Sequence, residues 1–243
     1  MIIVYLLRVL LRIVLFLIGS MSVTGREHVP ESGPYIIVVN HMSKADPPLL
    51  FLALPPMRLH FFAGEKWENH PLFGPIMKTV GVIYIKRGEV DRKALRQAME
   101  ALREGSIFGL APEGTRSKQG KLIEAKDGAA YLASRAKVPI LPCAVTNTDL
   151  VGENVKRLRR THMDVNIGEP FMLPSLGHRA KGRELEAYTH LIMIHIADLL
   201  PERYHGYYAD SPALAALQRG ADPWPYCLDI AGVEAPSPVP GGK

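Results

Sequence analysis

The chain has 243 residues, a length that suits one well-buried domain with a small appendage. Hydrophobic residues make up 47% and charged residues 22%, which excludes intrinsic disorder for most of the chain. The formal net charge of +5 indicates an anionic partner, but charge alone does not distinguish nucleic acid, a membrane surface and a phosphorylated substrate.

The first predicted element is an apolar helix over residues 2–18, IIVYLLRVLLRIVLFLI. Arg8 and Arg12 interrupt it four residues apart, on one helical face. A bilayer span needs about 20 apolar residues, and each central arginine costs about 2.5 to 3.5 kcal/mol on insertion scales. We therefore predict an amphipathic membrane-anchoring helix that lies in the interface, with both arginines among lipid headgroups. A tilted span, a signal peptide and a core helix are the alternatives.

After a turn-forming segment, short apolar runs alternate with helical patterns. Strands are predicted at 35–39, 58–64, 82–85, 106–111, 138–145 and 164–171, and helices at 46–56, 90–104, 128–136 and 182–200. This alternation predicts an α/β fold, with a mainly parallel mixed sheet flanked by helices.

The chain is expected to divide into an N-terminal helix (1–20), one globular domain (21–208) and a tail (209–243) rich in Pro, Ala and Gly. From Ser211 onward no periodicity is clear, so the tail is predicted to be loosely packed or disordered. Cys143 and Cys227 are far apart and lack metal-ligand spacing, which argues against a zinc site or disulfide framework and favours a reducing compartment.

A histidine and an aspartate lie five positions apart in NHMSKADP (40–47), directly after the first predicted strand. A helix would separate His41 and Asp46 by about 140° around its axis, and a strand would place them on opposite faces. Only a loop or a strand-to-helix turn lets them meet, and the pair would then be a general base with its orienting carboxylate. A capping or core histidine and a helix N-cap are the simpler interpretations. No G-x-S-x-G nucleophile is present, so such a pair would activate a hydroxyl of the substrate.

Three further stretches lie at or just beyond predicted strands: IKRG (85–88), PEGTRS (112–117) and VPILPCAV (138–145). If the strands are parallel, the loops that follow them converge at one crevice. A glycine, a hydroxyl and the forked donors of Arg116 suit a phosphate, although solvated loops often contain these residues. Arg87 would add a second positive charge. Glu113 would repel a phosphate, so we expect it to hold Arg116 or Arg87 in place.

Together these four stretches, in this order, resemble the four sequence blocks of the glycerolipid acyltransferases, in particular the bacterial 1-acylglycerol-3-phosphate acyltransferases. The resemblance covers roughly residues 20 to 200. It implies transfer of an acyl chain from acyl-coenzyme A or acyl carrier protein, as co-substrate, to the free hydroxyl of a lysophospholipid. It implies no other cofactor, no metal and no nucleic-acid partner.

Carried over position by position, the resemblance makes His41 the base and Asp46 its partner. The acceptor's phosphate would be bound by a set of residues from the second and third stretches: Arg87, Glu113, Gly114, Thr115 and Arg116. Pro139 and Pro142 would belong to the acyl side. The expected location is the cytoplasmic face of the cell membrane, peripheral or monotopic, against anionic lipids.

Other activities remain open at this stage. The acceptor could be another lysolipid or a glycolipid. A metal-dependent hydrolase could use His41, Asp46, His60 and His70, although their spacing matches no known ligand motif. A non-catalytic lipid-binding protein is the third alternative, but it gives no reason for a base beside a phosphate site.

Overall fold

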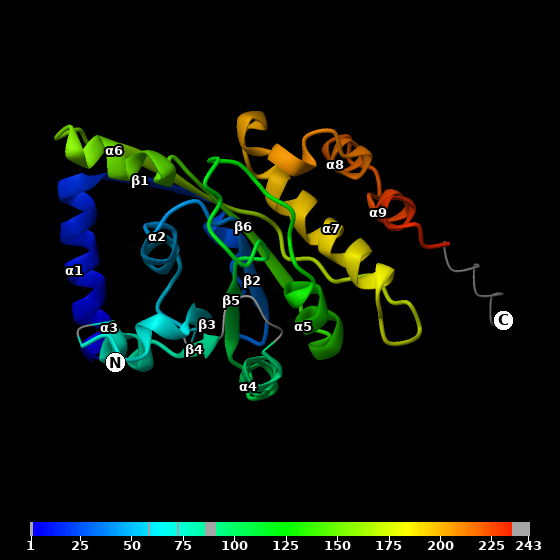
Figure 1. Ribbon diagram of the computed structural model, residues 1–243, viewed down its shortest axis with the longest axis horizontal. Coiled ribbons are helices and arrows are strands. Elements are labelled where there is room, and N and C mark those ends of the chain that lie inside the picture. Colours follow the sequence, from blue (N-terminus) through cyan, green and yellow to red (C-terminus); the bar gives the residue numbers. More distant parts are fainter. Residues whose placement is uncertain (1, 58, 72, 86–90, 235–243) are drawn as a thin grey trace.

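The computed structural model describes residues 2–57, 59–71, 73–85 and 91–234 (Figure 1). A seven-stranded sheet crosses the molecule in the order β1-β7-β6-β2-β5-β3-β4. Its strands are β1 (Gly19–Thr24), β2 (Ile36–Val39), β3 (Leu59–Gly64), β4 (Val82–Ile85), β5 (Ile107–Leu110), β6 (Ile140–Thr146) and β7 (Thr161–Ile167). All neighbouring strands are parallel except β6 and β7, so the predicted mainly parallel mixed sheet is confirmed.

Helices cover both faces of this sheet. They are α1 (Ile2–Ile18), α2 (Asp46–Ala53), α3 (Phe73–Thr79), α4 (Arg92–Arg103), α5 (Gly128–Ala136), α6 (Val151–Lys156), α7 (Arg183–Asp198), α8 (Pro212–Gln218) and α9 (Trp224–Ala231). Figure 1 shows α1 at one end of the molecule and α7 to α9 at the other.

The central strand β2 explains the two layers. Its residues alternate between faces, so Ile36 and Val38 pack in the core that contains α4, α5 and α7, while Ile37 packs with α2 on the other side. A strand buried on both faces reads as the continuous apolar run IIVV. The predicted α/β architecture is therefore confirmed.

The N-terminal helix has the predicted bounds, but one of its two arginines is not where we expected it. Arg8 is only 8% exposed, and its guanidinium donates hydrogen bonds to the carbonyl oxygens of Phe51 (2.7 Å), Leu52 (3.3 Å) and Leu54 (2.7 Å). The prediction that Arg8 lies among lipid headgroups is wrong, because the last carbonyls of α2 lack helical partners and accept these donors instead. Arg12 is exposed.

One side of α1 is nevertheless exposed and apolar. Its solvent-facing large side chains are Tyr5, Leu6, Leu10, Ile13, Val14, Phe16 and Leu17, with exposed fractions from 42% to 69%. Within the described ranges, no helix is both long and apolar enough to cross a membrane.

The C-terminal region differs from the prediction of a loosely packed tail. Ser211 caps α8 by accepting from the Leu214 N–H, and α8 and α9 pack with α7 through buried Ala213, Leu214, Cys227 and Leu228. The prediction is therefore wrong for 212–231, because helices of seven and eight residues are too short to give a clear period. Residues 235–243 lie outside the described residues, and the predicted domain boundaries stay predictions.

Candidate active site

The carboxyl ends of four parallel strands meet at one edge of the sheet, as the sequence predicts. A cavity of about 800 Å³ opens there. It is lined by His41 after β2, Gly64 at the end of β3, Ile85 at the end of β4 and Gly114 after β5. Parallel strands place their ends together, and open α/β sheets bind ligands at this position.

His41 and Asp46 do meet, through the predicted strand-to-helix turn. The distance between His41 Nδ1 and Asp46 Oδ2 is 2.8 Å. The same carboxylate oxygen also accepts the backbone N–H groups of Met42 and Ser43, each at 2.7 Å. Asp46 is therefore not an N-cap of α2, whose N-cap is Ala45; its carboxylate folds the turn back toward His41.

This contact decides which ring nitrogen of His41 can act as the base. An ionised carboxylate only accepts hydrogen bonds, so Nδ1 must carry the proton. Nε2 then holds the free lone pair, and the ring lines the cavity with 18% of its side chain exposed. Asp46 is only 2% exposed, and its Oδ1 is buried without a hydrogen-bond partner among the described residues.

The PEGTRS loop holds the backbone of His41 on both sides. Glu113 Oε2 accepts the His41 N–H at 2.6 Å, and the Ser117 N–H donates to the His41 carbonyl at 2.8 Å. Glu113 Oε1 accepts the Ile123 N–H at 3.2 Å. No ion pair between Glu113 and Arg116 is present among the described residues, so the Arg116 half of the prediction that Glu113 holds Arg116 or Arg87 is not borne out, and the Arg87 half stays a prediction. Arg87 lies outside the described residues.

Asn40 fixes the same turn from the other side. Its side-chain amide donates to the Val145 carbonyl at 2.9 Å and accepts the Val145 N–H at 2.8 Å, while the residue is fully buried. The amide thus extends the pairing between β2 and β6 by one position beyond the end of β2. Neither Asn40 nor Ser117 was predicted, because the partners of both residues are far away in the sequence.

Glu113 is the most strongly perturbed acid of the site. Burial, the largest cause, raises the pKa of Glu113 to about 7, and the negative charge of Asp46 adds to this effect. The N–H groups of His41 and Ile123 stabilise the carboxylate and lower the pKa, but they do not offset burial.

This pKa predicts how the stability of the fold depends on pH. The pKa of Glu113 is about 4.5 in the unfolded chain and about 7 in the folded protein. The folded state therefore binds the proton of Glu113 more tightly. The stabilisation is complete below pH 4.5 and is lost as the pH rises through 7, by about 3 kcal/mol. Glu113→Gln removes the titration. We expect the free energy of unfolding of wild type, relative to this variant, to fall by about 3 kcal/mol between pH 4.5 and 8.

Urea denaturation of both proteins at several pH values measures this difference. Glu31→Gln, the same substitution at an exposed carboxylate, is the matched control for effects of the substitution itself. A pH-independent difference for Glu113→Gln would contradict the raised pKa.

Of the other predicted residues in the PEGTRS loop, Gly114 lines the cavity but Thr115 and Arg116 do not. Gly114 lines the cavity and has a φ of +67°, a conformation that side chains with a Cβ rarely adopt. Thr115 is exposed and Arg116 half-buried, and neither lines the cavity. Lys126, which the sequence reasoning missed, does line it, and its methylene groups pack where a Cβ on Gly114 would lie.

Pro139 and Pro142 also do not line the cavity. Pro142 is buried in β6, an interior strand, and its carbonyl accepts the Gly168 N–H at 2.9 Å; the Pro139 carbonyl accepts the Ile36 N–H at 2.9 Å. Both prolines join strands of the sheet, and their role on the acyl side stays a prediction.

Most of the cavity wall is apolar. Its large apolar lining residues are Leu50, Phe51, Leu59, Phe61, Phe62, Leu95, Met99, Leu110, Tyr131 and Leu185. A cavity with a largely apolar wall and a smaller number of polar groups suits a ligand with a long hydrocarbon chain.

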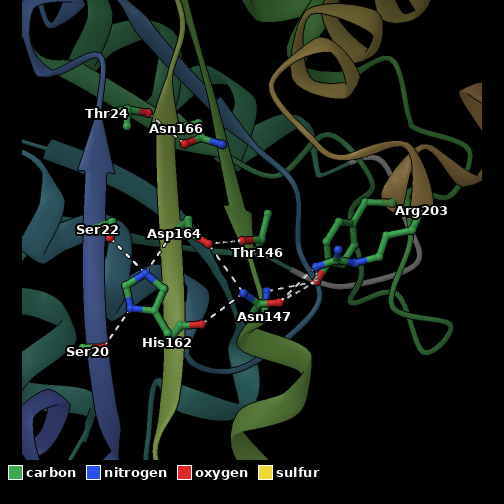
Figure 2. A network of polar contacts seen from close by, with 10 residues as sticks. Ser20, Ser22, Thr24, Thr146, Asn147, His162, Asp164, Asn166 and Arg203 are labelled. Carbon is green, nitrogen blue, oxygen red and sulfur yellow. Dashed lines mark hydrogen bonds and ion pairs between the residues drawn. The ribbon is translucent and has the colours of Figure 1, made fainter.

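A second group of polar side chains lies on β1, β7 and the end of β6 (Figure 2). His162 contacts Ser20 through Nδ1 (2.8 Å), and its Nε2 contacts both Ser22 (2.9 Å) and Asp164 (3.1 Å). In a hydrolytic triad Nε2 contacts the serine and Nδ1 contacts the acid. Here Asp164 contacts Nε2 and Ser20 contacts Nδ1, so this group lacks that geometry. None of its residues lines the cavity.

The metal-dependent hydrolase alternative also needs His60 and His70. His60 lies on β3, and its Nδ1 is 3.1 Å from the Gly81 carbonyl. Among the described residues, no group of three or more histidines, cysteines and carboxylates is arranged to hold a metal ion.

The family model described as Acyltransferase matches residues 20–146, which contain His41, Asp46 and the PEGTRS loop. The chain belongs to the acyltransferase family. A crystal structure of PlsC, the 1-acyl-sn-glycerophosphate (LPA) acyltransferase of Thermotoga maritima, superposes on this acyltransferase with a TM-score of 0.63. The match covers 81% of this chain and 79% of that one at 24% identity, which shows a shared fold.

Several curated relatives carry the name 1-acyl-sn-glycerol-3-phosphate acyltransferase. The Bacillus subtilis protein is 25% identical over 189 residues, which cover 78% of this acyltransferase and 92% of the relative. The Borreliella burgdorferi protein is 30% identical over 59% of the chain, and the human alpha protein 32% identical over 58%. The chain spans only 58% and 51% of the length of these last two relatives.

Proposed function

We propose that this acyltransferase transfers an acyl chain from an acyl thioester to the free hydroxyl of 1-acylglycerol-3-phosphate, which gives phosphatidic acid. The observation that carries the proposal is the His41–Asp46 pair at the end of an apolar cavity of about 800 Å³. The names of the relatives support this acceptor. Another lysolipid or a glycolipid acceptor is the alternative that keeps the same chemistry.

In this mechanism the acceptor hydroxyl lies beside His41 Nε2, which removes its proton as the oxygen attacks the thioester carbonyl. The new C–O bond forms and the C–S bond breaks, and the imidazolium returns the proton to the leaving thiolate. Asp46 stabilises the imidazolium through the 2.8 Å contact with Nδ1. Base catalysis of this kind contributes roughly 10²- to 10⁴-fold, and orientation of the two substrates contributes further.

The acceptor's phosphate needs cations near the hydroxyl-binding end of the cavity. Lys126 lines that end beside Gly114. Arg116 precedes Ser117, whose N–H binds the His41 carbonyl, so its main chain is a few ångströms from that of His41. We assign the phosphate to Arg116 and Lys126, together with Arg87 as the family resemblance implies.

A lipid acceptor requires contact with a membrane surface, and we propose the cytoplasmic face of the cell membrane. The exposed apolar side of α1 would enter the lipid, and the adjacent basic segment KRLRR (156–160) would face anionic headgroups. Arg160 joins the two: its guanidinium lies 5.2 Å from the centroid of the Phe16 ring and donates to the Gly19 carbonyl at 2.7 Å.

The function is tested by incubation of the purified protein with palmitoyl-coenzyme A and lysophosphatidic acid. We expect phosphatidic acid and free thiol in equal amounts, and much less product from lysophosphatidylcholine, whose phosphate is masked by choline. Thiol release without phosphatidic acid would indicate a thioesterase instead. Absence of both products, or stoichiometric zinc or iron in the protein, would count against the proposal.

A further inference from the structure

A second cavity, of about 880 Å³, lies next to the first. Both cavities are lined by Arg96, Met99 and Tyr131, so they adjoin along the groove between α4 and α5. The second cavity is closed on its other side by residues 172–180, and Tyr188 of α7 donates a hydrogen bond to the Pro174 carbonyl in this wall.

Positive charge dominates the lining of the second cavity. Five cationic side chains line it: Arg96, Arg103, Arg135, Lys137 and Arg179. Among its described lining residues Glu100 is the one carboxylate, and it forms no ion pair within 4.0 Å. We call this site the basic cavity. None of these five cations forms an ion pair with a described carboxylate, and five such cations in one concave site favour an anionic ligand with several charges.

Among these cations, Arg135 gives the strongest indication of an anionic ligand. Its guanidinium stacks on the Tyr131 ring at 5.2 Å, and its Nε is buried without a hydrogen-bond partner in the described part of the chain. A buried donor without an acceptor costs free energy, and an anion that enters the basic cavity would supply the acceptor. The side chain is also held in place by its own ring contact before any ligand binds.

Helix α4 sets the distance between the two cavities. Arg92, at its start, lines the cavity that contains His41, and Arg103, at its end, lines the basic cavity. These residues are eleven positions apart, which corresponds to about 16 Å along a helix axis. A pantetheine arm has about as many backbone bonds as four extended residues and reaches about 14 Å, which is close to this distance.

We propose that the basic cavity binds the phosphates at the nucleotide end of an acyl-coenzyme A donor. The pantetheine arm then follows the groove between α4 and α5 and brings the thioester to His41. This inference rests on the proposed acyl transfer and names its donor. The concave shape and volume suit a nucleotide, whereas an acidic carrier protein would need an open surface for its own folded domain.

The test compares donors that differ only at the nucleotide end. Arg103→Gln together with Arg135→Gln removes two cations of the basic cavity. We expect this double variant to raise the KM for palmitoyl-coenzyme A at least tenfold, since each charge-assisted hydrogen bond contributes roughly tenfold in affinity. The KM for palmitoyl-pantetheine, which has no phosphate, and the KM for lysophosphatidic acid should stay unchanged.

Lys93→Gln together with Arg219→Gln is the matched control. Like the test variant it removes two cations. Both are exposed, one on α4 and one at the end of α8, and neither lines the basic cavity. We expect wild-type values for every substrate. An equal loss with both donors in the Arg103 and Arg135 variant would show a structural defect and overturn the proposal. If the Arg103 and Arg135 variant lost activity with an acylated acyl carrier protein as donor but not with palmitoyl-coenzyme A, the proposal would be overturned in favour of a protein donor.

Binding measured without turnover separates this inference from the proposed function. Calorimetry with adenosine 3′,5′-bisphosphate and with coenzyme A should detect binding to wild type and a loss of at least tenfold in the double variant. If wild type transferred acyl chains to lysophosphatidic acid but the two proteins bound these nucleotides equally well, the proposed function would hold and the proposed donor site would be overturned. Binding without acyl transfer would support the site and contradict the proposed acceptor.

Discussion

Replacement of His41 by alanine is expected to lower kcat for acyl transfer by roughly 10²- to 10⁴-fold. The variant loses the Nε2 lone pair of a ring that lines the cavity but keeps the backbone contacts of residue 41 with Glu113 and Ser117. The KM values for both substrates should change little, because the proposed binding groups are untouched. Initial rates of thiol release with palmitoyl-coenzyme A and lysophosphatidic acid measure the effect.

The matched control is His162→Ala. His162 also contacts an aspartate, but it lies in the polar group on β1 and β7 and does not line the cavity. The activity of the His162→Ala variant should stay at the wild-type level. Added imidazole should restore part of the rate in the His41 variant, because it supplies a base to the vacated space. A His41 variant with full activity would remove this residue from the mechanism.

Asp46→Asn is expected to lower kcat by roughly 10²-fold or more, again with little change in KM. All three hydrogen bonds to the carboxylate reach Oδ2, so an asparagine oxygen at that position can keep the turn folded. The amide then has no negative charge to stabilise the imidazolium. Its NH₂ group would occupy the position of Oδ1, where it is a buried donor without a partner and costs about 1 to 3 kcal/mol of stability.

Kinetics and thermal denaturation of the same samples separate the two effects of Asp46→Asn. Asp164→Asn, which changes the aspartate beside His162, should leave kcat unchanged. A drop in kcat for the Asp46 variant that is fully explained by unfolded protein at the assay temperature would contradict the proposed electrostatic role.

Much of the fold follows from local patterns. The runs YIIVV and VIYI became β2 and β4, and the helix over 128–136 has the predicted bounds, because each segment carries its own apolar period and turn signals. Strand β1 was missed. In GSMSVT only Met21 and Val23 pack against the core, and both are only partly buried. The pairing of this strand with β7 joins residues about 140 positions apart.

The site was predictable to a similar degree. NHMSKADP identified His41 and Asp46 because both lie within one turn, and their contact could be tested against helix and strand geometry. The partner of Glu113 could not be found in this way. Glu113 binds the N–H of His41, 72 positions away. Every residue except proline has such an N–H, so the sequence does not indicate which one Glu113 binds. Lys126 and the basic cavity likewise depend on how α4 and α5 pack.

The three hydrogen bonds of Arg8 give the N-terminal helix a mechanical role. They attach the middle of α1 to the last carbonyls of α2, and α2 begins at Asp46. A helix attached in this way is not a flexible tether. Any surface that receives the apolar side of α1 therefore also determines the height and tilt at which the mouth of the catalytic cavity is presented to it.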